Sequence, residues 1–232
     1  MMKRWQVGLV VAVLCLGTQA WASVTVPSLS LTFDLVVSQV DTSPNGCSGG
    51  DATQCAAADG NLLSAVYREQ VSGNLLFLWQ LENTGSLPFD DVITWRFMPG
   101  DVPGTVSDMG SDGGFDGDIG LSGGTAPLTI AWNSVFTQVK ATFGDSFAGT
   151  GSPIGGGEHS TFWWAYTDAQ NYRGTDSSVE VFSTANGQVN GSGLSLNYNS
   201  YEPAPIPEPA TLFLMGSGLV GLAGAMRRKL AK

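Results

Sequence analysis

An alternation of polar and apolar residues with a period of two is the feature that most restricts how this chain can fold. It is clearest over residues 28–40, where Leu29, Leu31, Phe33 and Leu35 are separated by single polar residues. This is the pattern of a strand with one buried face. Seven further segments are rich in β-branched and aromatic residues and are bounded by turn-forming residues: 61–71, 74–82, 92–98, 134–143, 160–167, 178–184 and 192–201.

Helical patterns are missing from the same part of the sequence. No amphipathic helical run lies between residues 23 and 206, so the sequence offers no crossover helices for a parallel sheet. The sequence therefore predicts an all-β fold, an antiparallel β-sandwich or jelly-roll-like single domain over residues 23–200.

The acidic residues are concentrated in this predicted domain. Residues 23–206 hold nineteen of the twenty acidic residues but only four of the ten basic ones. Such a body repels phosphate groups and has no basic stripe that could release counterions from a nucleic acid. The charge pattern argues against nucleic-acid binding and favours solubility.

Residues 1–22 have the parts of a secretory signal peptide. Lys3 and Arg4 give a positive start, residues 7–16 are apolar, and Ala20 and Ala22 are the small residues that a signal peptidase reads. We expect cleavage after Ala22 and export of the rest of the chain.

The other end of the chain predicts a membrane span. Residues 210–226 are Gly-rich and nearly free of charge, and about 17 residues is the lower limit for a transmembrane helix. Arg227, Arg228 and Lys229 follow at once, and basic residues beside a span stay in the cytoplasm. Residues 227–232 then form a cytoplasmic tail, and the β domain lies on the opposite side of the membrane. Before the span, four prolines within residues 201–209 predict a stiff, extended spacer.

This tail resembles the PEP-CTERM sorting signal, in which Pro207, Glu208 and Pro209 precede a span and a basic end. The resemblance implies recognition and processing by an exosortase, a membrane transpeptidase of Gram-negative bacteria that make exopolysaccharide and biofilm matrix. It also implies a passage through the inner membrane on the way to the cell surface or extracellular matrix. It covers about the last 26 residues and carries no information about the β domain.

Two cysteines lie in the predicted mature chain, Cys47 and Cys55, and they flank a polar loop. In an oxidising compartment such a pair is expected to form a disulfide. A metal or redox pair is the alternative, although the spacing is longer than the usual two-residue motif.

Four aspartates lie in a Gly-rich segment, and their carboxylates are the hard oxygen ligands that calcium prefers: Asp108, Asp112, Asp116 and Asp118. Their spacing does not follow the calcium-binding helix–loop–helix pattern. Calcium is therefore a candidate cofactor here, and a solvated loop without metal is the alternative. No other cofactor is indicated.

Catalytic signatures are missing from the sequence. His159 has Glu158 and Ser160 as neighbours, but adjacent residues at the start of a strand point in alternating directions. No nucleophile elbow, zinc helix or phosphate-binding loop occurs. We therefore expect no enzyme, although the paired carboxylates of a glycosidase would leave no local pattern.

A run of aromatic residues offers a candidate binding surface. Alternation sends Trp163 and Trp164 to opposite faces of one strand, so an exposed indole could stack on a sugar ring. Burial on both sides is the alternative. The sequence thus predicts an exported, exosortase-processed surface or matrix protein with a non-enzymatic body that touches exopolysaccharide. A carbohydrate-binding or carbohydrate-active protein and a simple membrane-anchored periplasmic protein are the alternatives.

Overall fold

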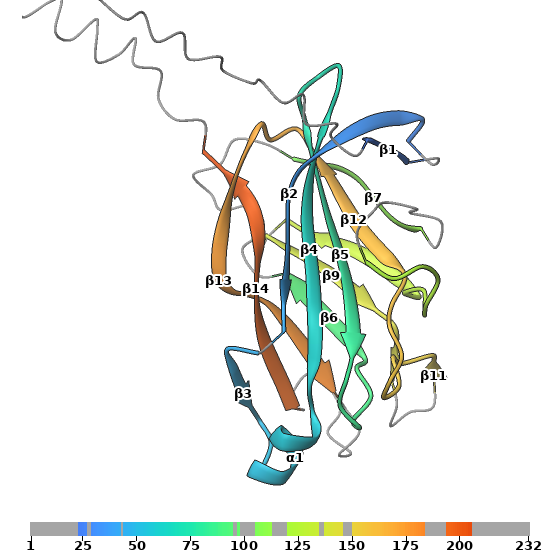
Figure 1. Cartoon of the computed structure of the whole chain (residues 1–232), viewed down its shortest axis with the longest axis vertical. Helices are drawn as coiled ribbons and strands as arrows, with labels where there is room; N and C mark the ends of the chain where they lie inside the picture. The colour runs from blue at the N-terminus through green and yellow to red at the C-terminus, as the bar shows by residue number, and fades with distance from the viewer. Residues whose placement is uncertain are drawn as a thin grey trace, which may run out of the picture.

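The structure is a computed structural model that describes residues 23–26, 29–42, 44–94, 97, 105–112, 120–134, 137–145, 150–183 and 194–205. These residues form fourteen strands and one short helix (Figure 1). The strands make two six-stranded sheets and a two-stranded hairpin, and every pair of named strands is antiparallel. The predicted antiparallel all-β fold is thus confirmed for this part of the chain.

Sheet A has the strand order β1-β2-β4-β5-β12-β7. Its strands are β1 (Ser23–Val26), β2 (Leu31–Asp41), β4 (Gly60–Glu69), β5 (Leu75–Asn83), β12 (Phe162–Thr167) and β7 (Val106–Asp112). Strands β4 and β5 pair over nearly their whole length, from Gly60 opposite Asn83 to Arg68 opposite Leu75.

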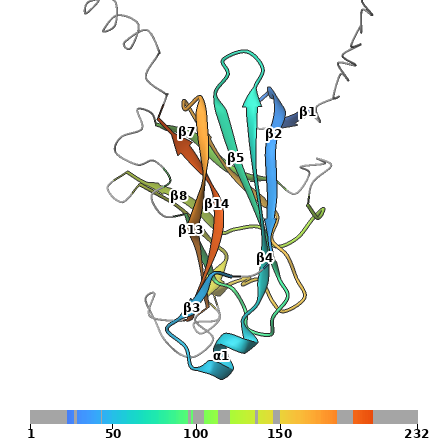
Figure 2. The same cartoon turned by 60° about the vertical axis from the view of Figure 1, so that its left-hand side comes forward.

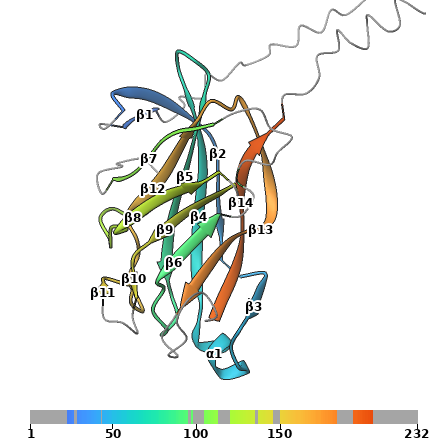
Figure 3. The ribbon, with the colours of Figure 1, turned by 180° about the vertical axis from the view of Figure 1, so that it is seen from behind.

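Sheet B has the order β3-β14-β13-β6-β9-β8 and is seen from behind in Figure 3. Its strands are β3 (Gly46–Ser48), β14 (Leu194–Ala204), β13 (Asn171–Ser183), β6 (Asp91–Thr94), β9 (Gln138–Thr142) and β8 (Thr129–Asn133). The remaining elements are the hairpin β10 (Gly144–Asp145) with β11 (Thr150–Gly151) and the helix α1 (Ala52–Ala57).

The two sheets form two layers, which Figure 2 shows side by side, and they share one hydrophobic core. Trp79 and Trp163 of sheet A stack in this core with ring centroids 6.2 Å apart, and each is 1% exposed. The Nε1 of Trp79 donates a hydrogen bond of 2.8 Å to the Oγ of Ser200 in sheet B. A buried indole N–H that finds a partner across the core links the two layers.

The outer face of sheet A is also largely buried, which the sequence did not settle. A second hydrophobic cluster lies there, made by Phe33, Leu63, Ala65, Tyr67, Leu76, Leu78, Phe162 and Trp164. Because neighbouring residues of a strand point to opposite faces, burial on both sides explains the unbroken apolar run from Leu75 to Trp79.

Several short elements were not predicted. Strands β1, β3, β7, β8, β10 and β11 lie outside the eight predicted segments, because a strand of two to seven residues gives little periodic signal. Helix α1 lies in a predicted polar loop. Its N-cap Asp51 accepts hydrogen bonds from the backbone N–H groups of Thr53 and Gln54, and the Gln54 side chain returns to the backbone of Asp51. This capping box stabilises a turn of helix without an apolar face.

The predicted Pro-rich spacer begins later than expected. Strand β14 continues to Ala204, and Tyr201–Ala204 pairs with Gly174–Asn171 of β13. The Nε of Arg173 donates to Glu202 at 2.6 Å, and the Glu202 side chain is only 6% exposed. Pro203 fits because strand β3 pairs only with Ser195–Asn197, so a residue without an N–H disturbs no ladder on that side.

Candidate functional site

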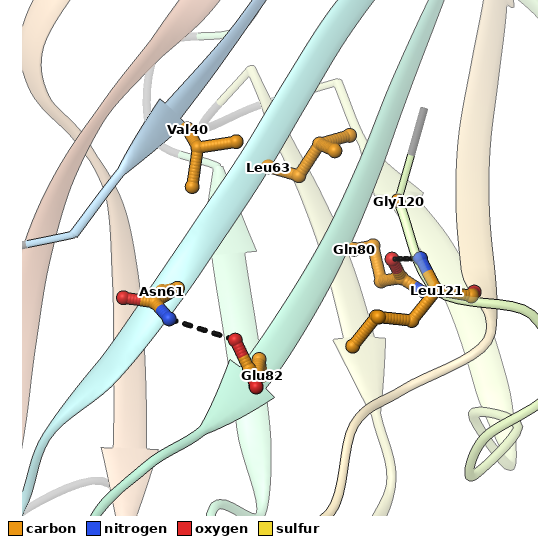
Figure 4. A pocket seen from close by; sticks show the side chains of 7 residues that line it. All are labelled: Val40, Asn61, Leu63, Gln80, Glu82, Gly120 and Leu121. Carbon is orange, nitrogen blue, oxygen red and sulfur yellow. Dashed lines mark hydrogen bonds between the residues drawn. The ribbon is translucent and has the colours of Figure 1, made fainter. Parts of the chain in front are cut away.

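A groove lies on the outer face of sheet A, where strands β2 and β5 end and strand β4 begins (Figure 4). Its volume is about 200 Å³. The apolar walls come from Val40, Leu63 and Leu121, and Val40 and Leu121 are among the large hydrophobic residues that remain exposed, at 55% and 44%. Exposed apolar side chains around a concave surface are a feature of binding sites.

One wall of the groove is fixed by the side chain of Gln80, which is 3% exposed. Its Oε1 accepts from the backbone N–H of Leu121 at 2.7 Å, and its Nε2 donates to the carbonyls of Leu121 and Ser160 at 2.6 and 3.0 Å. These bonds hold the loop at Leu121 against strand β5. Both N–H donors of the amide are used and its Oε1 already accepts one bond, so the side chain shapes the groove and has no donor left for a ligand.

A polar row borders the end of the groove and runs across strands β4 and β5 to the bridge residue His159. Asn61 of β4 lies opposite Glu82 of β5, and its Nδ2 donates to the Oε2 of Glu82 at 2.7 Å. On the other side, His159 lies opposite Glu82 in an isolated antiparallel bridge. The Nε2 of His159 lies 3.2 Å from the carbonyl oxygen of Ser122, and because a carbonyl only accepts, this nitrogen carries the proton. The row places one carboxylate between an amide and an imidazole.

Sequence reasoning missed this groove. Asn61, Glu82 and Leu121 lie far apart in the sequence and meet only through strand pairing and the loop contact of Gln80. No local motif could have found them. Alternation within a strand assigns each of Val40, Leu63 and Glu82 to one face of its own strand. It does not show that the three faces lie on the same side of the sheet.

The predicted sugar-stacking role of Trp163 and Trp164 is wrong. Both indoles are 1% exposed: Trp163 belongs to the core between the sheets and Trp164 to the outer cluster of sheet A. Neither offers a flat face on the surface. The alternative reading, a strand buried on both sides, is the correct one for β12.

The predicted aspartate-rich loop is partly a strand. Asp108 and Asp112 lie in β7, opposite Tyr166 and Phe162 of β12. Four residues of extended chain separate their Cα atoms by about 13 Å, so this segment does not curl around an ion. Asp116 and Asp118 lie outside the described residues. Within the described residues, no group of three His, Cys, Asp or Glu side chains could hold a metal ion.

The predicted disulfide is confirmed. Cys47 and Cys55 are bonded, and the bond links strand β3 to helix α1. It therefore closes the small loop at the edge of sheet B.

Glu158, His159 and Ser160 have separate roles in the fold. The Oε2 of Glu158 accepts from the backbone N–H of Gly155 at 2.9 Å. The Oγ of Ser160 is buried and accepts from the backbone N–H of Leu81 at 2.9 Å. Because each side chain holds a different backbone segment, these neighbours do not form a catalytic group in this geometry.

The predicted processing segments lie outside the described residues. These are the signal peptide with Ala20 and Ala22, the motif Pro207, Glu208 and Pro209, the span 210–226, and the basic residues Arg227, Arg228 and Lys229. The helix found in the described part of the chain is too short to cross a bilayer.

Comparison with known proteins bears on the tail. A family model described as the PEP-CTERM protein-sorting motif matches residues 205–229. The chain matches no curated protein and no solved structure. The match begins one residue after β14 ends at Ala204. The chain is therefore an exported, exosortase-targeted protein that carries a PEP-CTERM sorting motif and is transiently anchored in the membrane.

Proposed function

We propose that this protein is a non-enzymatic component of the cell surface or extracellular matrix, delivered by exosortase processing of its tail. The β-sandwich body acts by binding, and exopolysaccharide is its expected environment. The observation that carries the proposal is the position of the sorting motif directly after β14, the last described strand of the β-sandwich.

The position of the motif matters because processing of the tail then removes no described strand. Strand β14 is paired with β13 up to Ala204. The ion pair of Arg173 with Glu202 lies within this last paired segment and stabilises it. Removal of the residues after Pro205 leaves every described strand in place. The tail is thus better explained as a delivery signal than as a structural part of the domain.

The described side chains support a binding role over catalysis. The polar groups that sequence reasoning considered for chemistry, Glu158, His159 and Ser160, each bond to the backbone. The lining of the groove on sheet A contains one carboxylate, that of Glu82, whereas glycoside hydrolysis uses a pair of carboxyl groups. A simple membrane-anchored periplasmic protein is the competing function, since it needs only the span.

The experiment follows the full chain in an exosortase-positive host and in an isogenic strain without the enzyme. We expect the positive host to release the body without its tail and the negative strain to keep the intact chain in the membrane fraction, as judged by mass spectrometry. Glu208→Ala should reduce release, and the matched change Glu158→Ala should not. An intact tail on the protein in the positive host would favour the membrane-anchored alternative.

A second measurement tests the non-enzymatic role. The released protein is mixed with purified exopolysaccharide of the host, and both co-sedimentation and new reducing ends are measured. We expect co-sedimentation without new reducing ends. Hydrolysis of the polymer would replace the proposal with a carbohydrate-active enzyme.

A further inference from the structure

The groove on the outer face of sheet A combines apolar walls with one carboxylate at its end (Figure 4). Val40, Leu63 and Leu121 form the walls, and Glu82 closes the polar end. In the described part of the chain the ion pairs are those of Lys140 with Asp91 and of Arg173 with Glu202, so Glu82 forms no ion pair there, and the Nε2 of its neighbour His159 bonds to the carbonyl of Ser122. A half-buried carboxylate without a cation favours a positively charged ligand.

The hydrogen bonds around the groove define which atoms remain for a ligand. Asn61 donates to the Oε2 of Glu82 at 2.7 Å, which orients the carboxylate and leaves Oε1 as the free acceptor among the described atoms. The amide donors of Gln80 are used by the carbonyls of Leu121 and Ser160, and its Oε1 accepts from the backbone of Leu121. The groove therefore presents an acceptor at one end and aliphatic carbon elsewhere.

We propose that this groove binds a lysine side chain of a protein partner. A lysine has an unbranched aliphatic stem that packs along apolar surface while its charged head reaches a polar group. Its ammonium only donates hydrogen bonds, which matches a site that offers acceptors. The acidic body, with nineteen of the twenty acidic residues, also raises the local concentration of cations near the site.

A sugar ring fits this groove less well than a lysine stem. Each carbon of a pyranose carries or adjoins an oxygen that needs a hydrogen-bond partner, and burying a hydroxyl without one is unfavourable. The walls at Val40, Leu63 and Leu121 offer no such partner. This inference concerns recognition by the body and is independent of how the tail delivers the protein.

The experiment measures binding to the full chain in detergent with isotope-labelled Leu and Val methyl groups. The probe is Nα-acetyl-lysine methylamide, and the matched neutral probe is Nα-acetyl-norleucine methylamide. We expect saturable shifts of the Val40, Leu63 and Leu121 methyl signals with the lysine probe. The norleucine probe should bind at least threefold more weakly at low salt, because it lacks the ion pair.

Two isosteric variants separate the parts of the site. Glu82→Gln keeps an acceptor for Asn61 but removes the charge, and we expect roughly three- to fivefold weaker lysine binding. Val40→Thr replaces one methyl group of the apolar wall with a hydroxyl at an exposed position and should weaken binding by about twofold. Glu180→Gln, on the outer face of sheet B, is the matched control and should change nothing.

Three results would overturn the inference. Equal affinity for the lysine and norleucine probes would show an apolar site only, and unchanged binding in Glu82→Gln would place the ammonium elsewhere. Tighter binding of glucosamine than of the lysine probe would assign the groove to an amino sugar. None of these results depends on tail processing, so the delivery function is tested separately.

Discussion

Sheet A and sheet B have the same number of strands, and they differ in what covers their outer faces. The outer face of sheet A carries Leu76, Leu78 and Trp164 in a buried cluster. The outer positions of sheet B alternate with its core positions and include the half-buried Glu180 and the ion pair of Lys140 with Asp91. Two-sided burial makes the central strands β4 and β5 of sheet A buried at nearly every residue, whereas one-sided burial gives strands β6 and β9 of sheet B an alternation of buried and half-buried residues.

This difference also places the groove. The outer face of sheet A is apolar and buried over most of its area, but it is open at one end. Val40 and Leu121 remain exposed at that end. The lesson is that the second buried face of sheet A creates the site.

The largest expected effect tests whether both faces of sheet A are true core. Trp163→Ala and Trp164→Ala should each lower the free energy of unfolding by about 3–5 kcal/mol, because each removes a fully buried indole and leaves a cavity. Denaturant titration measures both. Trp132→Ala, at the half-exposed edge strand β8, is the control and should cost less. A cost below about 1 kcal/mol for Trp164→Ala would mean that the outer face of sheet A is not core.

The next effect concerns the edge of sheet B. Replacing Cys47 and Cys55 together by Ser should lower the free energy of unfolding by about 2–3 kcal/mol, because the disulfide closes a short loop in the unfolded chain. Thermal denaturation of the double variant measures this, and the parent protein under reducing conditions should behave alike. A reduced parent that is as stable as the oxidised one would show that sheet B needs no such closure.

A smaller effect tests the bond that joins the two sheets. Ser200→Ala removes the acceptor of the Trp79 N–H and should cost about 1–3 kcal/mol, because a buried donor is left without a partner. Denaturant titration again provides the measurement. The neighbouring change Ser195→Ala, which removes an Oγ 2.9 Å from Ser48 at the sheet edge, serves as the comparison. Equal and negligible costs would mean that the core bond contributes nothing.

The smallest effect concerns Tyr198 on the inner face of sheet B. Its hydroxyl is buried and has no partner among the described residues, so Tyr198→Phe should leave the free energy of unfolding within about 1 kcal/mol of the parent at neutral pH. Burial, followed by the negative charges of Asp59 and Asp41, raises the pKa of Tyr198.

The sign of the pH dependence follows from that raised pKa. The folded protein keeps the phenol neutral, so its contribution to stability is complete below the unfolded value near 10 and is lost as the pH rises above it. Tyr198→Phe should therefore lose less stability than the parent between neutral pH and alkaline pH. An identical alkaline decline in both proteins would contradict the raised pKa.

The sequence alone determined those features that are local in the chain. Alternation predicted strand β2, and enrichment in β-branched and aromatic residues between turn-forming residues predicted β4, β5, β12, β13 and β14. Residue type and spacing predicted the disulfide, and the order of motif, apolar stretch and basic residues predicted the sorting tail that the family match then found.

Only the tertiary structure decided which faces are covered and which residues meet. Alternation sends Trp163 and Trp164 to opposite faces but does not say that both faces are buried. Asn61, Glu82 and His159 come together through pairing between distant strands, and Gln80 then fixes the loop that completes the groove. Such contacts depend on register and layer packing, which no local pattern in this chain encodes.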